Sequence, residues 1–208
     1  LNKILKEEEH KILECAKLIY DSYKKGGQLY IFGTGHSRLL GEEAFHRAGG
    51  FAAACPIRDD NLTFKKGATK ATSLERTPNI ARKALQKYKI TKKDVLMVVS
   101  NSGVNHAPVE AAMIAKERGI KSIALTSIKY SKKAPLSKLN KKLYELVDIF
   151  IDNKIPPGDT IIKINKFSVG PASTITGSFI LNLILIEVAS MLKTEKIFPF
   201  YISSNMPN

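Results

Sequence analysis

Two short segments of the chain carry hydroxyl and backbone N–H groups that could bind an anion. Gly33-Thr-Gly-His-Ser37 follows the apolar run 29–32, and Ser100-Asn-Ser-Gly103 follows the apolar run 95–99. Short apolar runs that end in turn residues predict buried strands. A glycine-rich turn between a strand and a helix presents N–H groups at the positive end of the helix, where anions bind. Two such turns predict a site for a small anion, most simply a phosphorylated metabolite.

The glycine turn does not match a nucleotide-binding motif. Arg38 stands where the dinucleotide fingerprint requires its third glycine. Asp59 lies near the spacing from the glycine turn at which the fingerprint places a ribose-binding acid, but it does not follow the kind of element boundary that the fingerprint requires. The sequence contains no Gly-Lys-Ser/Thr, which excludes a P-loop. Thr126-Ser127 and Ser173-Thr174 add hydroxyls at later boundaries. Helix capping explains any one of these hydroxyl groups, but their expected meeting at one sheet edge favours a ligand site.

Two glutamates and one histidine are candidates for acid–base chemistry. Glu43 and Glu75 lie near expected junctions between loops and helices, where a cleft could set the pKa of a general base. A solvated helix face is the simpler explanation for a single glutamate. Glu75 is the better placed, because the segment 73–76 comes just before the helix start at Thr77-Pro78. His36 lies inside the glycine turn.

The histidines, cysteines and charge narrow the class of protein. No histidine has metal-ligand spacing to another histidine or to a cysteine, so we expect neither a metal nor a cofactor. Cys15 and Cys55 are far apart, which is typical of a reduced, cytoplasmic protein, and the charged segment 1–9 does not resemble a signal peptide. The net charge of +14 comes from 33 basic residues, of which only six are arginine. No nucleic-acid-reading motif is present, so we expect a solvated lysine-rich surface and no nucleic-acid partner.

Strand-like and helix-like patterns alternate along the whole chain. This alternation predicts one α/β domain over residues 1–208, with three α/β/α layers and a five-stranded parallel sheet. The expected strands are 29–32, 51–57, 95–99, 123–125 and 149–151. The expected helices are 4–23, 39–48, 78–88, 108–119, 136–147 and 172–192, with a long irregular loop over 58–77 and a turn-rich loop over 154–159.

Two apolar segments near the end of the chain need separate interpretation. The segment 172–192 is apolar enough to suggest a membrane span, but Thr176, Asn182 and Glu187 interrupt it. We therefore expect a buried central helix and no membrane partner. The apolar tail 197–202 predicts either self-association or an additional edge strand within the chain.

Four segments together resemble the sugar isomerase (SIS) domain, and their order and spacing cover most of the chain. These are Gly33–Gly41, Val99–Gly103, Thr126-Ser127 and Gly170–Thr174. Three further segments resemble a bacterial branch of single-SIS-domain proteins whose activity is unassigned: Ser73–Arg76, Pro156–Asp159 and Ser203–Asn205. The resemblance implies a flavodoxin- or Rossmann-like parallel sheet, a phosphorylated sugar as ligand and a homodimer or homotetramer.

The resemblance also implies roles for individual residues. Phosphate would be held by the hydroxyls of Ser100, Ser102, Ser173 and Thr174 and by the side-chain amide of Asn101. Gly35 and Ser37 would close the sugar site.

Enzymes of this family suggest what the candidate acids could do. Family isomerases use a base to move a proton through an enediolate, and Glu75 is the first candidate for it, Glu43 the second, with His36 assisting ring opening. A related etherase eliminates lactate with two acids, one matching Glu75 in position and the other falling on Arg47, which argues against that reaction. We expect a phosphosugar isomerase. The alternatives are a non-catalytic phosphosugar sensor and a related lyase or etherase.

Overall fold

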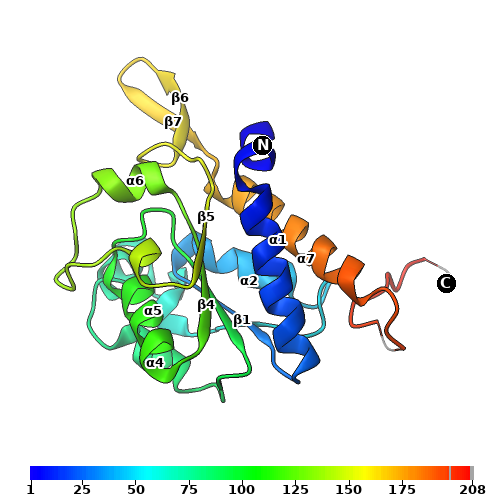
Figure 1. Cartoon of the computed structure of the whole chain (residues 1–208). Helices are drawn as coiled ribbons and strands as arrows, with labels where there is room; N and C mark the ends of the chain where they lie inside the picture. Colours follow the sequence, from blue (N-terminus) through cyan, green and yellow to red (C-terminus); the bar gives the residue numbers. More distant parts are fainter. Residues whose placement is uncertain (197, 207–208) are drawn as a thin grey trace.

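Five short parallel strands form the central sheet in the computed structural model, which describes residues 1–196 and 198–206 (Figure 1). The strand order is β2-β1-β3-β4-β5, so β1 lies inside the sheet, with β2 on one side of it and β3, β4 and β5 on the other. The strands are β1 (Leu29–Gly33), β2 (Ala54–Pro56), β3 (Val95–Val99), β4 (Lys121–Thr126) and β5 (Ile149–Asp152). The expected fold class is confirmed.

Helices cover both faces of the sheet, because the side chains of each inner strand alternate between two apolar cores. Leu29 and Ile31 join one core, whereas Tyr30 and Phe32 join the other. The first core is shared with α1 (Asn2–Lys24), α2 (Leu39–Ala44) and α7 (Ser173–Leu192). The second is shared with α4 (Ile80–Leu85) and α5 (His106–Arg118).

Helix α7 is long and apolar enough to cross a membrane, judged by length and composition. In this fold its buried side chains, among them Ile180, Ile184 and Val188, belong to the core that α1 and the sheet share. It therefore serves as a core helix of the domain, as the polar interruptions predicted.

Several elements are shorter or more regular than the sequence suggested. Strand β2 covers only part of 51–57, and α2 and α4 are six residues each. The segment 58–77, expected to be irregular, contains two 3₁₀ turns and a helix. These are η2 (Asp60–Leu62), η3 (Phe64–Lys66) and α3 (Ala68–Leu74).

The helix expected over 136–147 is wrong. The structure has only the 3₁₀ turn η4 (Leu143–Glu145) there, and a helix, α6 (Ile128–Lys133), comes before it. The Ser127 hydroxyl starts α6 by accepting a hydrogen bond from the Tyr130 amide at 3.1 Å. Pro135 holds Ala134 in an extended conformation, and Asn140 has a φ of 50°, so a helix cannot pass through either position.

A β-hairpin precedes α7, between the expected turn-rich loop over 154–159 and the expected helix, where the sequence analysis predicted no element. Its strands, β6 (Thr160–Ile164) and β7 (Phe167–Pro171), are antiparallel and joined by a two-residue turn. Asn165 in that turn has a φ of 53°, a conformation that asparagine tolerates. Figure 1 shows the hairpin projecting from the body of the domain beside the amino-terminal end of α7.

The apolar tail folds back onto its own chain. The Ala52 amide donates to the Pro199 carbonyl, and Tyr201 exchanges hydrogen bonds with Gly49 and Gly50 at 2.8 and 3.0 Å. Phe200 packs on Phe51 with ring centroids 5.2 Å apart. Of the segment 197–202, Ile197 lies outside the described residues. Much of the tail is therefore paired with residues 49–52 of the same chain, as the expected edge strand within the chain would be.

Candidate functional site

The candidate residues gather where the strand order changes direction. Strand β1 has β2 on one side and β3 on the other, and Gly33 is in register with Val99. In open α/β sheets, ligands bind beyond the carboxyl ends of the strands at such a switch point. The two anion-binding turns predicted from sequence follow these two strand ends and so lie side by side.

The glycine turn after β1 is packed too closely for other residues. A Cβ on Gly33 would lie 2.6 Å from the Ser37 carbonyl carbon, and Gly35 has a φ of 52°. A Cβ on Gly35 would meet the Phe64 ring at 3.2 Å. His36 is exposed and lies against Phe64, with ring centroids 4.9 Å apart. The turn is therefore covered by the segment that follows β2.

The turn after β3 is held in shape by its own first residue. The buried Ser100 hydroxyl accepts a hydrogen bond from the Gly103 amide at 3.2 Å. The Asn101 Oδ1 accepts from Asn153 Nδ2 at 2.9 Å, while the buried Asn101 Nδ2 has no partner among the described residues. Ser102 is half-buried in the same turn. This unpartnered amide gives the site a hydrogen-bond donor for a ligand.

A cavity of about 10 Å³ joins this turn to the glycine turn and to the start of α7. Such a volume accommodates about one water molecule. Its polar lining consists of Ser37, Asn101, Asn153, Ser173 and Thr174. The structure thus brings together four of the residues predicted from sequence. Asn153 was missed, although its position directly after β5 places it on the same sheet edge.

A carboxylate occupies the amino-terminal end of α7. Asp159 Oδ1 accepts from the Ser173 amide at 2.8 Å and from the Ala172 amide at 3.2 Å. Its Oδ2 accepts from the Ser173 hydroxyl at 2.5 Å. An acidic side chain is favourable there because of the helix dipole. Asp159 therefore takes the hydrogen-bond donors of Ser173 that sequence reasoning assigned to a ligand anion.

Glu75 lies between the ends of β1 and β3, at the carboxyl end of α3. Its Oε2 accepts from the Thr34 hydroxyl at 2.7 Å, and its Oε1 accepts from Asn105 Nδ2 at 2.7 Å. The Glu75 carbonyl also accepts from the Ala107 amide at the start of α5. The carboxylate is half-buried and held from both sides, so its orientation is fixed at the sheet edge.

Glu43 has different surroundings. It forms an ion pair with Arg47 one turn along, and it accepts a hydrogen bond from Asn182 of α7 at 3.5 Å. These contacts tie α2 to α7 and do not join Glu43 to Thr34 or Asn105. Ser127 is likewise engaged, because it caps α6 and donates to the Ile155 carbonyl.

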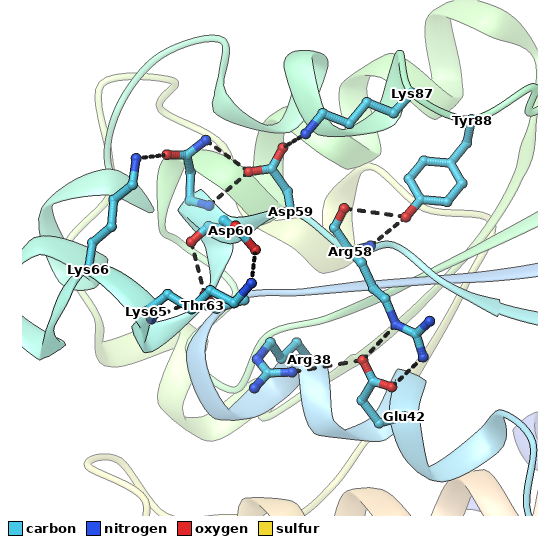
Figure 2. A network of polar contacts seen from close by, with 11 residues as sticks. Arg38, Glu42, Arg58, Asp59, Asp60, Thr63, Lys65, Lys66, Lys87 and Tyr88 are labelled. Carbon is cyan, nitrogen blue, oxygen red and sulfur yellow. Dashed lines mark hydrogen bonds and ion pairs between the residues drawn. The ribbon is translucent and has the colours of Figure 1, made fainter.

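A second cavity, of about 260 Å³, lies beside the glycine turn and is lined largely by charged side chains. Figure 2 shows the polar contacts among several of these side chains. Arg58 binds Glu42 through two hydrogen bonds of 3.0 and 2.7 Å, and these lower the pKa of Glu42. Arg38 reaches the same carboxylate at 3.8 Å. These contacts fasten the segment after β2 to α2.

Asp59 anchors the same segment from within. Burial by itself raises its pKa, but hydrogen bonds from Lys87 and Asn61 outweigh burial and leave the pKa below its usual value. The Lys87 contact is 2.6 Å. The cover over the glycine turn therefore depends on charged groups of α2 and of the segment after α4.

Comparisons with known proteins agree with the family resemblance of the sequence. A family model for the SIS domain matches residues 1–127. A UPF0309 protein from Brucella canis is 41% identical over 196 residues, which cover 93% of this chain and 80% of that protein.

Two solved structures illustrate the likeness in fold. A phosphoheptose isomerase from Francisella tularensis matches with a TM-score of 0.58 and 16% identity, over 86% of this chain and 84% of that one. The sugar isomerase domain of an RpiR transcription factor from Sphaerobacter thermophilus matches with a TM-score of 0.56 and 17% identity, over 92% and 84%. At these identities the likeness establishes the fold.

Proposed function

Because this chain belongs to the SIS domain family, we propose that it binds a phosphorylated sugar and interconverts its aldose and ketose forms. One observation carries the proposal. The Glu75 carboxylate is oriented by Thr34 and Asn105 at the sheet edge where the hydroxyl-rich turns meet. A base must lie within hydrogen-bond reach of the proton it removes, and this edge is where ligands of such sheets bind.

The proposed reaction needs only proton transfers. Hydroxyls and amides of the turns and of the α7 start hold the phosphate, with Ser102, Ser173 and Thr174 as the main donors. Glu75 removes the proton from the hydroxyl-bearing carbon next to the carbonyl, which gives an enediolate. A second proton moves from the hydroxyl of that carbon to the former carbonyl oxygen, and Glu75 returns the first proton to the former carbonyl carbon. Glu75 thereby regains its charge. His36 assists the opening of the sugar ring.

The test begins with a thermal-shift panel of sugar phosphates, because a ligand that binds the native state raises the melting temperature. A sugar that binds is then followed by NMR for exchange of its C2 proton with solvent deuterium. We expect Glu75→Gln to abolish exchange and retain binding. Glu43→Gln is the matched comparison and should exchange like the parent. Exchange by Glu75→Gln at the parent rate would refute the assignment of the base.

A non-catalytic phosphosugar sensor is the second candidate. Two observations favour it: the cavity at the predicted phosphate site is only about 10 Å³, and Asp159 holds the Ser173 donors. A site that must open to admit its ligand suits a protein that reports binding by changing conformation. Binding of a sugar phosphate without any proton exchange in the parent protein would support this candidate over the isomerase.

A further inference from the structure

A chain of hydrogen bonds fixes which end of the Asn101 side-chain amide remains free at the candidate cavity. The Asn153 Oδ1 accepts from the Ile155 amide at 3.2 Å, so the other end of that side chain, Nδ2, must act as a donor. It donates to the Asn101 Oδ1 at 2.9 Å, which leaves the Asn101 Nδ2 without a partner among the described residues. The Ile155 amide thus determines, through Asn153, that Asn101 offers a donor.

This chain of hydrogen bonds is shielded from water. Asn153 is 1% exposed, and it lines the cavity together with Asn101. On the far side, the buried Ser127 hydroxyl donates to the Ile155 carbonyl and holds that residue in place. Because water cannot reach Asn153 to replace a lost partner, a change at this side chain releases the Asn101 amide.

A buried group of charges holds the residues on both sides of Asn153. The Glu8 side chain of α1 lies beneath them: its Oε2 accepts from the Asp152 amide at 3.2 Å, and its Oε1 accepts from the Lys154 ammonium. The Asp152 Oδ2 lies 3.3 Å from the same ammonium, and the Asp152 Oδ1 accepts from the Lys154 amide at 3.1 Å. One carboxylate of α1 therefore contacts both neighbours of Asn153.

The residue that these charges hold is strained. Lys154 has a φ of 59°, a left-handed conformation that any residue with a Cβ disfavours. Such a conformation persists where its surroundings over-determine it, and here the carboxylates of Glu7, Glu8 and Asp152 converge on the Lys154 ammonium. The conformation at 154 sets the direction in which the chain leaves β5. It therefore sets where the Ile155 amide meets the Asn153 side chain.

We propose that Asn153 is a positioning residue of the candidate site, kept in place by the cluster of Glu8, Asp152 and Lys154. It orients the Asn101 amide so that Nδ2 faces an anionic group of the ligand, the phosphate of the proposed substrate. This proposal rests on the phosphosugar function proposed above and adds the reason why a neutral amide favours an anion there. The opposite orientation of the Asn101 amide would present an oxygen and repel a phosphate.

The first experiment titrates the full chain calorimetrically with inorganic phosphate and with the sugar phosphates of the thermal-shift panel. Asn153→Ala and Asn101→Ala should each weaken binding about tenfold, which is the effect of one charge-assisted hydrogen bond. The double variant should bind no more weakly than Asn101→Ala, because Asn153 acts only through Asn101. A merely structural role of Asn153 would instead give additive losses.

The matched control is a buried carboxylate far from the site. Asp94 accepts from the Gln28 and Thr91 amides at 2.8 and 2.6 Å, before the amino-terminal ends of β1 and β3. Asp94→Asn should lower the melting temperature and leave phosphate affinity unchanged. Loss of affinity in this control would show that general destabilisation weakens binding.

A pair of variants at position 154 tests the charged cluster. Lys154→Ala and Lys154→Gly remove the same ammonium, but only glycine adopts the left-handed conformation without strain. We expect Lys154→Ala to bind phosphate about fivefold or more weakly than Lys154→Gly. Equal affinities of the two variants would overturn the role of the cluster.

NMR of the side-chain amides reads the orientation without a ligand. The Asn153 NH₂ protons should exchange slowly with solvent in the parent and in Lys154→Gly, and faster in Lys154→Ala, because this group is buried and hydrogen-bonded only when correctly placed. Phosphate should shift the Asn101 NH₂ signals of the parent.

The outcomes separate this proposal from the proposed function. Phosphate binding that Asn153→Ala leaves unchanged would overturn the positioning role and leave the phosphosugar function standing. Phosphate binding that depends on Asn153, without proton exchange on any bound sugar, would refute only the isomerase reaction. A parent that binds neither inorganic phosphate nor any sugar phosphate of the panel would overturn both.

Discussion

Replacing Asp159 with asparagine should tighten the binding of a phosphorylated ligand. In the structure the Asp159 carboxylate accepts three hydrogen bonds at the start of α7, two of them from Ser173. A ligand phosphate that uses Ser173 must first break these bonds. Asp159 is therefore a competitor of the phosphate for the same donors, and its negative charge opposes the approach of another anion.

The size of the effect follows from the bonds that are lost. Hydrogen bonds to a charged group contribute about 1.5–3 kcal/mol each. Asparagine keeps a carbonyl oxygen that can still cap the helix, but it has no second acceptor and no charge. Loss of one such bond to Ser173 corresponds to an affinity gain of about tenfold or more. The loss of the favourable charge–dipole contact should cost about 0.3–1 kcal/mol of folding stability.

The assay is a calorimetric titration with a sugar phosphate that binds the parent, with inorganic phosphate as a minimal ligand. Asp21→Asn is the matched control, because it removes the same charge from the last turn of α1, which leads into the amino-terminal end of β1 and so lies at the other edge of the sheet. Its affinity should equal that of the parent. If Asp159→Asn binds the ligand equally or more weakly, Asp159 supports the site and does not compete with the ligand.

Three further predictions concern the scaffold around the site. Gly33→Ala should abolish ligand binding while the sheet remains folded by circular dichroism, because the new Cβ would lie 2.6 Å from the Ser37 backbone; unchanged affinity would contradict the tight turn. Lys87→Met should destabilise the fold by about 1 kcal/mol at neutral pH, since it removes a partner of the buried Asp59 carboxylate. The pKa of Asp59 is lowered on folding, so its stabilising effect is present above the unfolded pKa and is lost as the pH falls through the folded pKa. The difference in unfolding free energy between the parent and Lys87→Met should therefore shrink from about pH 5 towards about pH 2. A difference that stays constant over this range would be inconsistent with this role of Lys87. Burial raises the pKa of the Cys15 thiol, so a thiol reagent should label Cys15 only after denaturation, and rapid labelling of the native protein would disprove its burial.

Local sequence patterns determined the layers of this fold. Apolar runs such as 95–99, bounded by turn residues, gave the five strands, and their alternation with helices required a parallel sheet. The position of Glu75 at the sheet edge was also predicted, because it lies in sequence between the long polar loop and the start of the next helix. The helix expected over 136–147 failed for a local reason: Asn140, in a left-handed conformation, interrupts it.

Contacts between distant segments could not be predicted in this way. Glu110 of α5 accepts hydrogen bonds from the Asn79 and Ala81 amides at the start of α4, and no sequence pattern marks it as a cap. Asn101 follows β3 and Asn153 follows β5. Their side chains meet because the strand order separates β5 from β3 by only one strand, at the same edge of the sheet. Asp159 meets Ser173 only because an unforeseen hairpin returns the chain to its own base.

The sequence by itself therefore determined which residues could bind an anion and on which edge of the sheet they would lie. Hydrophobic periodicity and turn residues depend only on neighbours along the chain, and they decide which segments become helices or strands and in which direction the strands run. Only the tertiary structure decided that Asp159 occupies the Ser173 donors, that Glu75 is held by Thr34 and Asn105, and that the hairpin exposes an apolar face. Each of these depends on hydrogen bonds or packing between residues that only the path of the chain brings together.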